Sequence, residues 1–457
     1  MKIKIPHTLV LLFLLMIFSL ALTWMLPSGG FSFEENEMGI EVVVPGSYEV
    51  FEEKQYLSPA SLFTVVPRAF ADAQGIIFFV LIIGGALAVV RETGAIDALL
   101  GKLVQNFGDL PGPLLFITMF AFAAASATLG MAEEYIPFAI ILVALCIALR
   151  MDAVTAIGTM VVGYGIGYGI AIMNPFTLLI AQDVAGLQPT SGMRFRLILA
   201  VPLLTIGFIH VWRYAKKVQS DPKSSLLYGI DQDKKDQVYD YPEMTGSRIV
   251  VLLITLIVLV LLVLGIWLQG WYLIELGAIF LALAIVVGIV SGIGINKTAE
   301  TFGRGAAELT ATALLIGFAR SIALIMEDGE ILHTVVHALS TPLSFAGSEI
   351  AAVGMLFIQS MLNFFIPSGS GQALVTMPLM APIGDLVGVS RQVSVLAFQL
   401  GDGLMNMVVP TNPVLMGILG LAGIPYDKWF KFIFPLLIQL LIISSIALAF
   451  AVWIGYS

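Results

Sequence analysis

Two stretches of this chain resemble one another, and each interrupts apolar sequence with polar residues, Gly and Pro. The first starts with the string Gly130-Met131-Ala132-Glu133-Glu134 and later reaches Asn174-Pro175. The second starts with Ser368-Gly369-Ser370-Gly371-Gln372 and later reaches Asn412-Pro413. Paired hydrophobic segments that are broken by Gly and Pro in corresponding halves mark the binding site of secondary transporters. The repeated pattern therefore predicts a transporter with one central site.

The composition restricts the chain to a membrane. Of its 457 residues, 59% are hydrophobic and 12% are charged, whereas a soluble globular protein has about 25% charged residues. We therefore predict an all-α polytopic membrane protein. The net charge of -9 gives no reason to expect nucleic-acid binding, and the single cysteine, Cys146, excludes a disulfide within the chain.

The apolar runs and the charged loops predict spans and their orientation. A helix needs about 20 apolar residues to cross a bilayer. Residues 29–57 hold seven Glu and one Lys, which places them outside, and the basic segment 214–247 should be cytoplasmic. The N-terminus is then cytoplasmic, and we expect a bacterial cytoplasmic (inner) membrane. The expected spans are about 8–28, 74–91, 194–213, 248–268, 272–292, 306–326 and 429–455.

The basic loop divides the chain into two repeats, residues 1–213 and 248–457. Each repeat has two apolar arms around a polar tip, at about 111–149 and 347–388, and then a broken helix, at about 153–187 and 391–422. Because two acids end the arms of 111–149, we expect each pair of arms to be a re-entrant hairpin instead of two spans. The repeats would then be inverted, as alternating access through one site requires. Two crossings per pair would leave the overall orientation unchanged.

The two tips have different chemistry. Glu133 and Glu134 are candidates to bind a cation, either a substrate group, a proton or Na+, although carboxylates also stabilise a helix N-terminus. Ser368, Gly369, Ser370 and Gln372 offer hydroxyls and close approach to the backbone, although a plain turn would look the same. A serine-protease role would need a general base, and no His follows Ser370.

Helix breaks supply further candidate ligands. Pro175 and Pro413 each free a backbone carbonyl, and the neighbouring Asn174 and Asn412 add side-chain oxygens that suit a substrate or Na+. The alternative is a simple kink. Asp402, with Asn406 and Thr411 nearby, is the candidate for coupling to an ion, Na+ or H+, and the alternative is a structural pair with Arg320. No cofactor is expected.

The chain resembles the YfcC-type branch of the C4-dicarboxylate anaerobic carrier (DcuC-like) family, within the ion-transporter superfamily. The resemblance implies a homodimer with a scaffold domain and a transport domain, an elevator-like motion, and a substrate held between two hairpins and two broken helices. Relatives of this type resemble arginine/ornithine antiporters. The matching strings are Leu22-Thr23-Trp24-Met25-Leu26-Pro27, Val44-Pro45-Gly46-Ser47-Tyr48, Gly130-Met131-Ala132-Glu133-Glu134, Asn174-Pro175-Phe176, Pro367-Ser368-Gly369-Ser370-Gly371-Gln372 and Gly401-Asp402-Gly403.

The residues themselves favour a cationic substrate. A dicarboxylate site needs several donors or an Arg, and neither tip contains an Arg, whereas one tip presents two acids. The expected function is secondary transport of basic amino acids, such as arginine, ornithine or lysine, by antiport or ion coupling. Two alternatives remain, a C4-dicarboxylate symporter or antiporter and, less favoured, an ion channel. The sequence has no plausible catalytic set, so an enzyme is not expected.

Overall fold

The computed structural model describes residues 8–35, 41–44, 46–107, 110–132, 135–174, 176–230, 242–269, 271 and 273–457. It confirms the expectation of a helical membrane protein. Within these ranges, seven helices are long and apolar enough to cross a bilayer, and the bent pair formed by residues 295–308 and 313–328 would make an eighth span.

Eight helical elements of the first half recur in the same order in the second half. The helices of the first half are α1 (Thr8–Met25), α2 (Ser61–Asp72), α3 (Gln74–Glu92), α4 (Ala95–Phe107), α5 (Pro111–Leu129), α6 (Ile136–Ala148), α7 (Ala153–Ile170), α8 (Leu178–Val184) and α9 (Met193–Ser220). After α10 (Gly246–Gln269) and α11 (Leu273–Val290), the order from α2 to α9 returns as α12 (Ile295–Glu308), α13 (Thr310–Asp328), α14 (Leu332–Ser340), α15 (Ser348–Phe365), α16 (Gly369–Val387), α17 (Arg391–Met405), α18 (Pro413–Leu421) and α19 (Tyr426–Trp453).

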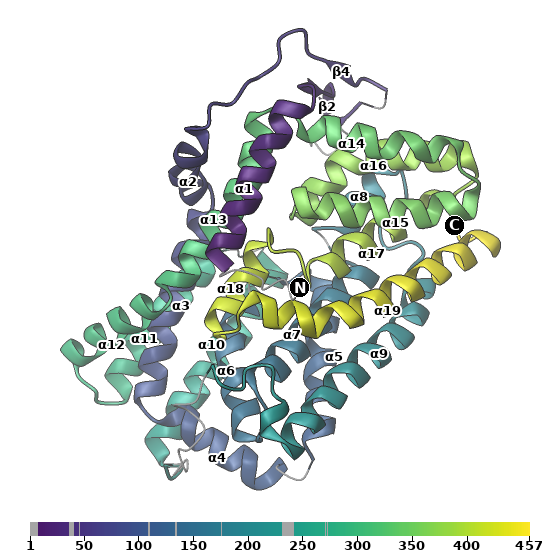
Figure 1. The fold of residues 1–457 in the computed structure, drawn as a ribbon. Coiled ribbons are helices and arrows are strands. Elements are labelled where there is room, and N and C mark those ends of the chain that lie inside the picture. The colour runs from purple at the N-terminus through teal and green to yellow at the C-terminus, as the bar shows by residue number, and fades with distance from the viewer. Residues whose placement is uncertain are drawn as a thin grey trace.

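Some corresponding elements lie at opposite ends of the molecule (Figure 1), whereas α7 and α17 pack against each other. Helices α4 and α6 of the first half lie toward the lower end of the view, and α14 and α16 lie toward the upper end. The amphipathic helices α2 and α12 are likewise separated, one high and one low. The acidic loop before α2 is on the same upper side as α14.

The acidic loop contains strands that the sequence interpretation did not foresee. Strands β1 (Gly29–Gly30) and β4 (Glu49–Val50) pair antiparallel, as do β2 (Phe33–Glu35) and β3 (Glu41–Val43). The Gly29 N–H also donates to the Glu330 carbonyl over 2.9 Å. A backbone hydrogen bond therefore joins the loop to the turn that follows α13.

One premise of the hairpin prediction needs correction. Helix α5 has 19 residues and α15 has 18, and both are apolar enough to cross a bilayer, whereas α6 has 13 residues and is shorter than a span. The first arm of each predicted hairpin is thus long enough to be a span, and the polar tips remain the ground for predicting re-entrant hairpins. The expected span at 306–326 also starts later, because α12 ends at Glu308 and α13 starts at Thr310.

The buried helix α7 forms the centre of the fold, with every residue from Ala153 to Ile170 buried. A Cβ at Gly163 or Gly167 would collide with α5 backbone, and a Cβ at Gly165 would collide with Met407, just beyond the end of α17. Glycines on two sides of α7 thus let two neighbours approach closely. This packing places both helix breaks near one another.

Candidate functional site

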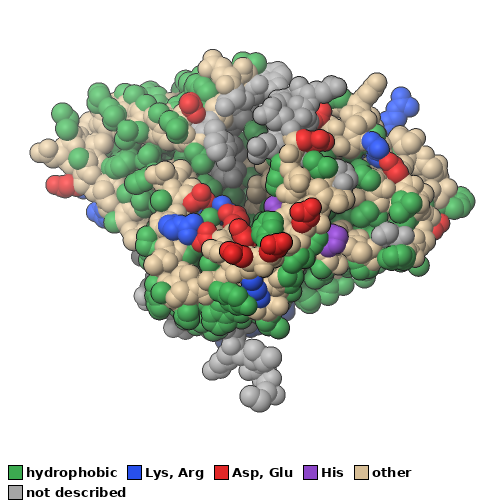
Figure 2. Space-filling view, turned by 90° about the horizontal axis from the view of Figure 1, so that it is seen from above, with side chains coloured by type: hydrophobic (Ala, Val, Ile, Leu, Met, Phe, Trp, Pro, Cys, Tyr) green, Lys and Arg blue, Asp and Glu red, His purple; other side chains and the backbone are tan. Residues whose placement is uncertain are grey.

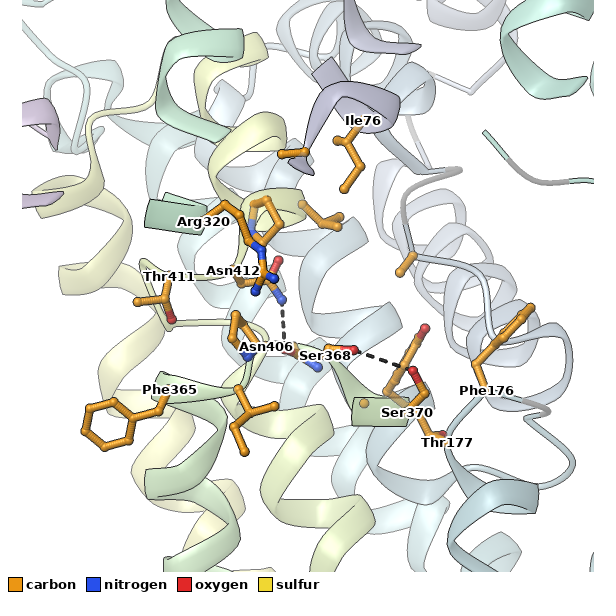
Figure 3. Close-up of a pocket in the computed structure, with 18 of the residues that line it drawn as sticks. Ile76, Phe176, Thr177, Arg320, Phe365, Ser368, Ser370, Asn406, Thr411 and Asn412 are labelled. Carbon is orange, nitrogen blue, oxygen red and sulfur yellow. Dashed lines mark hydrogen bonds between the residues drawn. The ribbon is translucent and has the colours of Figure 1, made fainter. Parts of the chain in front are cut away.

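A cavity of about 490 Å³ lies where both tips and both helix breaks meet. Residues of α2 and α13 complete the wall of the cavity. The cavity thus brings the predicted site segments together with charged residues that the sequence analysis did not assign to the site. Figure 3 shows this cavity. Its polar and charged lining residues are Asp72, Tyr164, Tyr168, Thr177, Arg320, Glu327, Ser368, Ser370, Asn406, Thr411 and Asn412.

The first tip lines the cavity through Gly130 and Ala132. Gly130 ends α5 with a left-handed backbone (φ 72°), a conformation that glycine adopts without strain. Its carbonyl accepts a hydrogen bond of 2.8 Å from the Tyr168 hydroxyl of α7. Glu133 and Glu134 follow within the same tip but lie outside the described residues, as does Pro175.

Asn174 is fully buried and holds the first break together instead of lining the cavity. Its Nδ2 donates to the Ser126 carbonyl over 3.1 Å. Its Oδ1 accepts from the Phe176 and Thr177 backbone N–H groups over 2.9 and 3.1 Å. The cavity wall here consists of Phe176 and Thr177, which the sequence interpretation missed and which simple adjacency to the Asn-Pro break could have indicated.

The second tip starts α16. Ser368 caps this helix, because its Oγ accepts from the Gly371 N–H over 3.4 Å, and Ser370 Oγ lies 3.5 Å from Ser368 Oγ (Figure 3). Ser368, Gly369 and Ser370 line the cavity. A helix N-terminus carries partial positive charge and unpaired N–H groups, which favour an anionic group. Gln372 is instead fully buried behind the tip.

The second break lines the cavity more completely than the first, through Thr411, Asn412 and Pro413. Asn412 caps α18, with its Oδ1 accepting from the Leu415 N–H over 3.0 Å. Its Nδ2 donates to Asn406 Oδ1 over 2.7 Å (Figure 3). Thr411 Oγ1 donates to the Phe364 carbonyl over 2.7 Å, which ties the break to the end of α15.

Asp402 lies one layer behind this wall and is fully buried. Its Oδ1 accepts from Asn363 Nδ2 over 2.7 Å and from Asn406 Nδ2 over 3.4 Å. Within the described part of the chain, Asp402 Oδ2 and Asn363 Oδ1 have no hydrogen-bond partner. The structural alternative from the sequence is wrong, because the acidic partners of Arg320 are Asp72 and Glu327 and do not include Asp402.

The amide chain around Asp402 extends into the second hairpin. Asn363 Nδ2 lies 3.3 Å from Gln372 Oε1, and Gln372 Nε2 donates to Gln359 Oε1 over 2.7 Å. Gln359 Nε2 then donates to Thr376 Oγ1 over 2.9 Å. The sequence interpretation missed Gln359 and Asn363, although two amides in the apolar run of α15 were a usable signal.

Arg320 faces the cavity from α13, between two acids. Its Nε contacts Asp72 Oδ2 at the end of α2, and its Nη1 lies 3.2 Å from Glu327 Oε1. The three side chains are 29%, 48% and 40% exposed, so this wall is open to solvent. The sequence interpretation treated Arg320 only as a member of an ion pair, because proximity to the tips cannot be read from spacing alone.

A second cavity, of about 770 Å³, lies between α3, α4 and α12 on one side and α6 and α18 on the other. Its charged lining residues are Arg91, Glu92, Asp97, Arg304 and Glu308. Helices α4, α6 and α12 occupy the lower part of Figure 1, whereas α14, which borders the first cavity, is in the upper part. The two cavities therefore lie toward opposite ends of the molecule, and only the first is lined by the described residues of the tips and breaks.

The chain is similar to bacterial proteins over nearly its whole length. It is 34% identical to an Escherichia coli K12 protein that bears the provisional name basic amino acid antiporter YfcC, over 99% of this chain and 97% of that protein. It is 28% identical to an uncharacterised Haemophilus influenzae protein over 97% of this chain and 96% of that protein. An Escherichia coli K12 protein, provisionally named a short-chain fatty acid transporter, is 28% identical over 50% of this chain and 53% of its own length.

Two solved transporter structures align with most of the chain at low similarity. The Alcanivorax borkumensis YdaH transporter has a TM-score of 0.43 and 17% identity, with 98% of this chain and 99% of that chain covered. Neisseria gonorrhoeae MtrF, described as illuminating a class of antimetabolite efflux pumps, has a TM-score of 0.42 and 16% identity, with 98% and 95% covered. Neither similarity is high enough to transfer topology or mechanism.

A sequence profile settles the family. The profile of the C4-dicarboxylate anaerobic carrier family matches residues 5–453. This match spans both repeats, both tips and both breaks. The chain therefore belongs to the C4-dicarboxylate anaerobic carrier family, whose members are membrane transporters and not enzymes.

Proposed function

We propose that this chain is a secondary active transporter of basic amino acids, such as arginine, ornithine or lysine, in a bacterial inner membrane. The observation that carries the proposal is the 490 Å³ cavity, in which both tips and both breaks meet a wall of two acids and one Arg. Volumes of about 300–1,000 Å³ are typical of small-molecule sites. An amino acid with a long side chain fits this range.

The two walls suit the two ends of such a substrate. The α-carboxylate would bind at the N-terminus of α16, where Ser368 and Ser370 add hydroxyls beside backbone N–H groups. The cationic side chain would face Asp72 and Glu327 across the cavity. Glu133 and Glu134 follow Ala132 in the first tip and are candidates to add negative charge. The provisional name of the 34% identical relative agrees with a basic amino acid as the substrate.

The surface near the cavity mouth supports attraction of cations. Exposed acids occur in the loop before α2 and at the end of α13, namely Glu49, Glu52, Glu53, Glu327 and Glu330. Figure 2 shows acidic side chains gathered near the middle of the face that is seen from above. A cleft lined by one sign of charge raises the local concentration of oppositely charged substrate.

A C4-dicarboxylate is the second candidate substrate. The family name points to it, and Arg320 together with the N-terminus of α16 could bind two carboxylates. Against it, Arg320 already contacts two acids, so the charge of the three side chains, +1 -1 -1, sums to -1. A doubly negative substrate would meet net repulsion there.

Coupling to Na+ or H+ is proposed at Asp402. A buried carboxylate needs a compensating cation or proton, and both Asp402 Oδ2 and Asn363 Oδ1 lack donors within the described residues. Asn406 and Asn412 connect this group to the cavity. The side-chain oxygen of Asn174 already accepts two backbone hydrogen bonds, so we favour Asp402 over Asn174 as the place of the coupling ion.

Two further features of the mechanism are proposed. The tips would belong to re-entrant hairpins of a transport domain that moves in an elevator-like way against a scaffold, and the scaffold would form a homodimer. The supporting observation is that two separate cavities lie toward opposite ends of the molecule, one at the tips and breaks beside α2 and α13 and the other beside α3, α6 and α12. Closing one cavity while opening the other would give alternating access.

Exchange in proteoliposomes tests the proposed function. Vesicles loaded with unlabelled ornithine should take up labelled arginine faster than empty vesicles, and unlabelled lysine outside should compete. Vesicles loaded with succinate should not accelerate arginine uptake. If succinate exchange is fast and arginine exchange is absent, the dicarboxylate function replaces the proposed one.

A further inference from the structure

We propose that Asp72, Arg320 and Glu327 form a cation-binding subsite in which the guanidinium of Arg320 occupies the place that a substrate cation takes. This inference rests on the proposed function and deepens it. The three residues come from α2 and α13, outside the tips and breaks. Each of them lines the 490 Å³ cavity.

The geometry of Arg320 shows what the two carboxylates can hold. Arg320 uses Nε for Asp72 and Nη1 for Glu327, so one guanidinium bridges both acids. The guanidinium group of free arginine has the same shape and the same donors as this side chain. A site that fits one guanidinium between two carboxylates therefore fits the substrate group as well, provided that Arg320 moves aside.

Space for that movement exists within the cavity. Arg320 and the second break line the same void, and in Figure 3 the Arg320 side chain extends toward Asn412 and Asn406. The side chains of Asp72 and Glu327 are 48% and 40% exposed, so a solute can reach them without opening the core. Exposed ion pairs contribute little to stability because solvent screens them, so the Arg320 pairs are weak enough to exchange.

Charge balance then favours a monocation over an anion. The three side chains together carry a charge of -1, so one bound cationic group brings the total charge of the subsite, with the displaced Arg320 included, to zero. A carboxylate in the same place would raise the repulsion from two acids. Arg320 therefore acts as a tethered competitor that neutralises the acids in the empty carrier, and the substrate replaces it.

Equilibrium binding of labelled arginine to the purified full-length protein tests the subsite. Asp72→Asn and Glu327→Gln should each weaken arginine binding by up to about fivefold, which is the affinity change expected from the loss of one exposed ion pair. Arg320→Gln should tighten binding, by up to about fivefold, because the competitor is lost. The arginine affinity of Arg320→Lys should fall between those of the wild type and Arg320→Gln, since an ammonium cannot bridge two carboxylates as a guanidinium does. Arg320→Lys also tests the proposal if Arg320→Gln does not accumulate in the membrane.

A matched control lies on the same two helices. Arg68 of α2 pairs with Asp328 of α13 at 2.6 and 2.9 Å, and neither residue lines the cavity. Arg68→Gln makes the same charge change as Arg320→Gln and should leave arginine affinity within about twofold of the wild type.

The outcomes separate the subsite from the proposed function. Weaker arginine binding in Arg320→Gln, or unchanged binding in all variants of the three residues, would overturn the subsite while leaving a wild-type arginine transporter intact. A wild type that binds succinate and ignores arginine would overturn the proposed function itself, and the subsite with it.

Discussion

The Asn-Pro breaks of the two repeats look alike in sequence, yet their asparagines make different contacts. Asn174 uses both side-chain atoms to hold its own turn and the end of α5, and it does not reach the cavity. Asn412 caps its helix through Oδ1, and its Nδ2 donates a hydrogen bond to Asn406. Both residues line the cavity. Among the residues that the structure describes, the second break and not the first is continuous with buried acceptors that lack donors, at Asp402 and Asn363.

This difference assigns separate tasks to two similar segments. The first break is a closed hydrogen-bonded turn, which suits a rigid wall of the cavity. The second break adjoins a buried carboxylate and a chain of amides, which suits binding and release of a charged ligand. Repeated sequence thus gives repeated backbone geometry, while individual side chains decide which copy carries the charge.

Removal of the carboxylate should have the largest effect. Asp402→Asn keeps the size of the side chain and its place in the amide chain, but it removes the only acid in that network. We expect ion-dependent transport to fall on the order of a hundredfold, because bonds to a charged group are worth about 1.5–3 kcal/mol each. Uptake measured against Na+ and pH gradients checks this, with membrane insertion as the control. Retained ion dependence in the variant would contradict the assignment.

The two asparagines give the next effect and test the comparison itself. Asn412→Ala and Asn174→Ala should both reduce transport without preventing insertion, but for different reasons. Asn412→Ala should weaken substrate affinity by about tenfold or more. Asn174→Ala leaves two backbone N–H groups and one carbonyl without their partner, at about 1–3 kcal/mol each, so its main effect should be on thermal stability.

Measured affinity and Tm of the purified variants distinguish these two effects. The comparison fails if Asn174→Ala changes affinity more than Asn412→Ala does while its Tm stays at the wild-type value. It also fails if both variants transport as the wild type does.

Substitution of two glycines of the second tip should have a smaller effect on transport, and the two variants form a matched pair. A Cβ at Gly369 would collide with Thr177 of the first break and come within 3.1 Å of Asp402 Oδ2. A Cβ at Gly371 would meet Ser368 at 3.3 and 3.5 Å, which asks for only a slight shift. Gly369→Ala should therefore lower transport severalfold, and Gly371→Ala should change it little. Equal rates in the two variants would show that the tip does not approach the first break.

Much of the helix order follows directly from the sequence. Runs of apolar residues give α3, α10, α11 and α19 close to their expected bounds, and the breaks fall where Pro and Asn interrupt apolar sequence, between α7 and α8 and between α17 and α18. The short strands of the acidic loop could not be foreseen, because two- and three-residue pairings carry almost no sequence pattern.

The candidate site was only partly predictable. Polar residues in apolar sequence pointed to Ser368, Asn412 and Asp402. Their partners were harder to find, because Arg320 and Asp72 are 248 positions apart and meet only through the packing of α2 against α13. Spacing along a chain also cannot show that Asn174 points into its own turn while Asn412 faces a cavity.

Thermal stabilisation of the detergent-purified wild-type protein tests the central claim, the charge of the substrate, most directly. A ligand that binds only the folded state raises its apparent stability, by about 2.7 kcal/mol at a concentration of 100 Kd. Arginine, ornithine and lysine should raise the Tm in a concentration-dependent way, and succinate and malate should not. If succinate or malate raises the Tm and the three basic amino acids leave it unchanged, the site binds dicarboxylates and the account given for its charged wall is wrong.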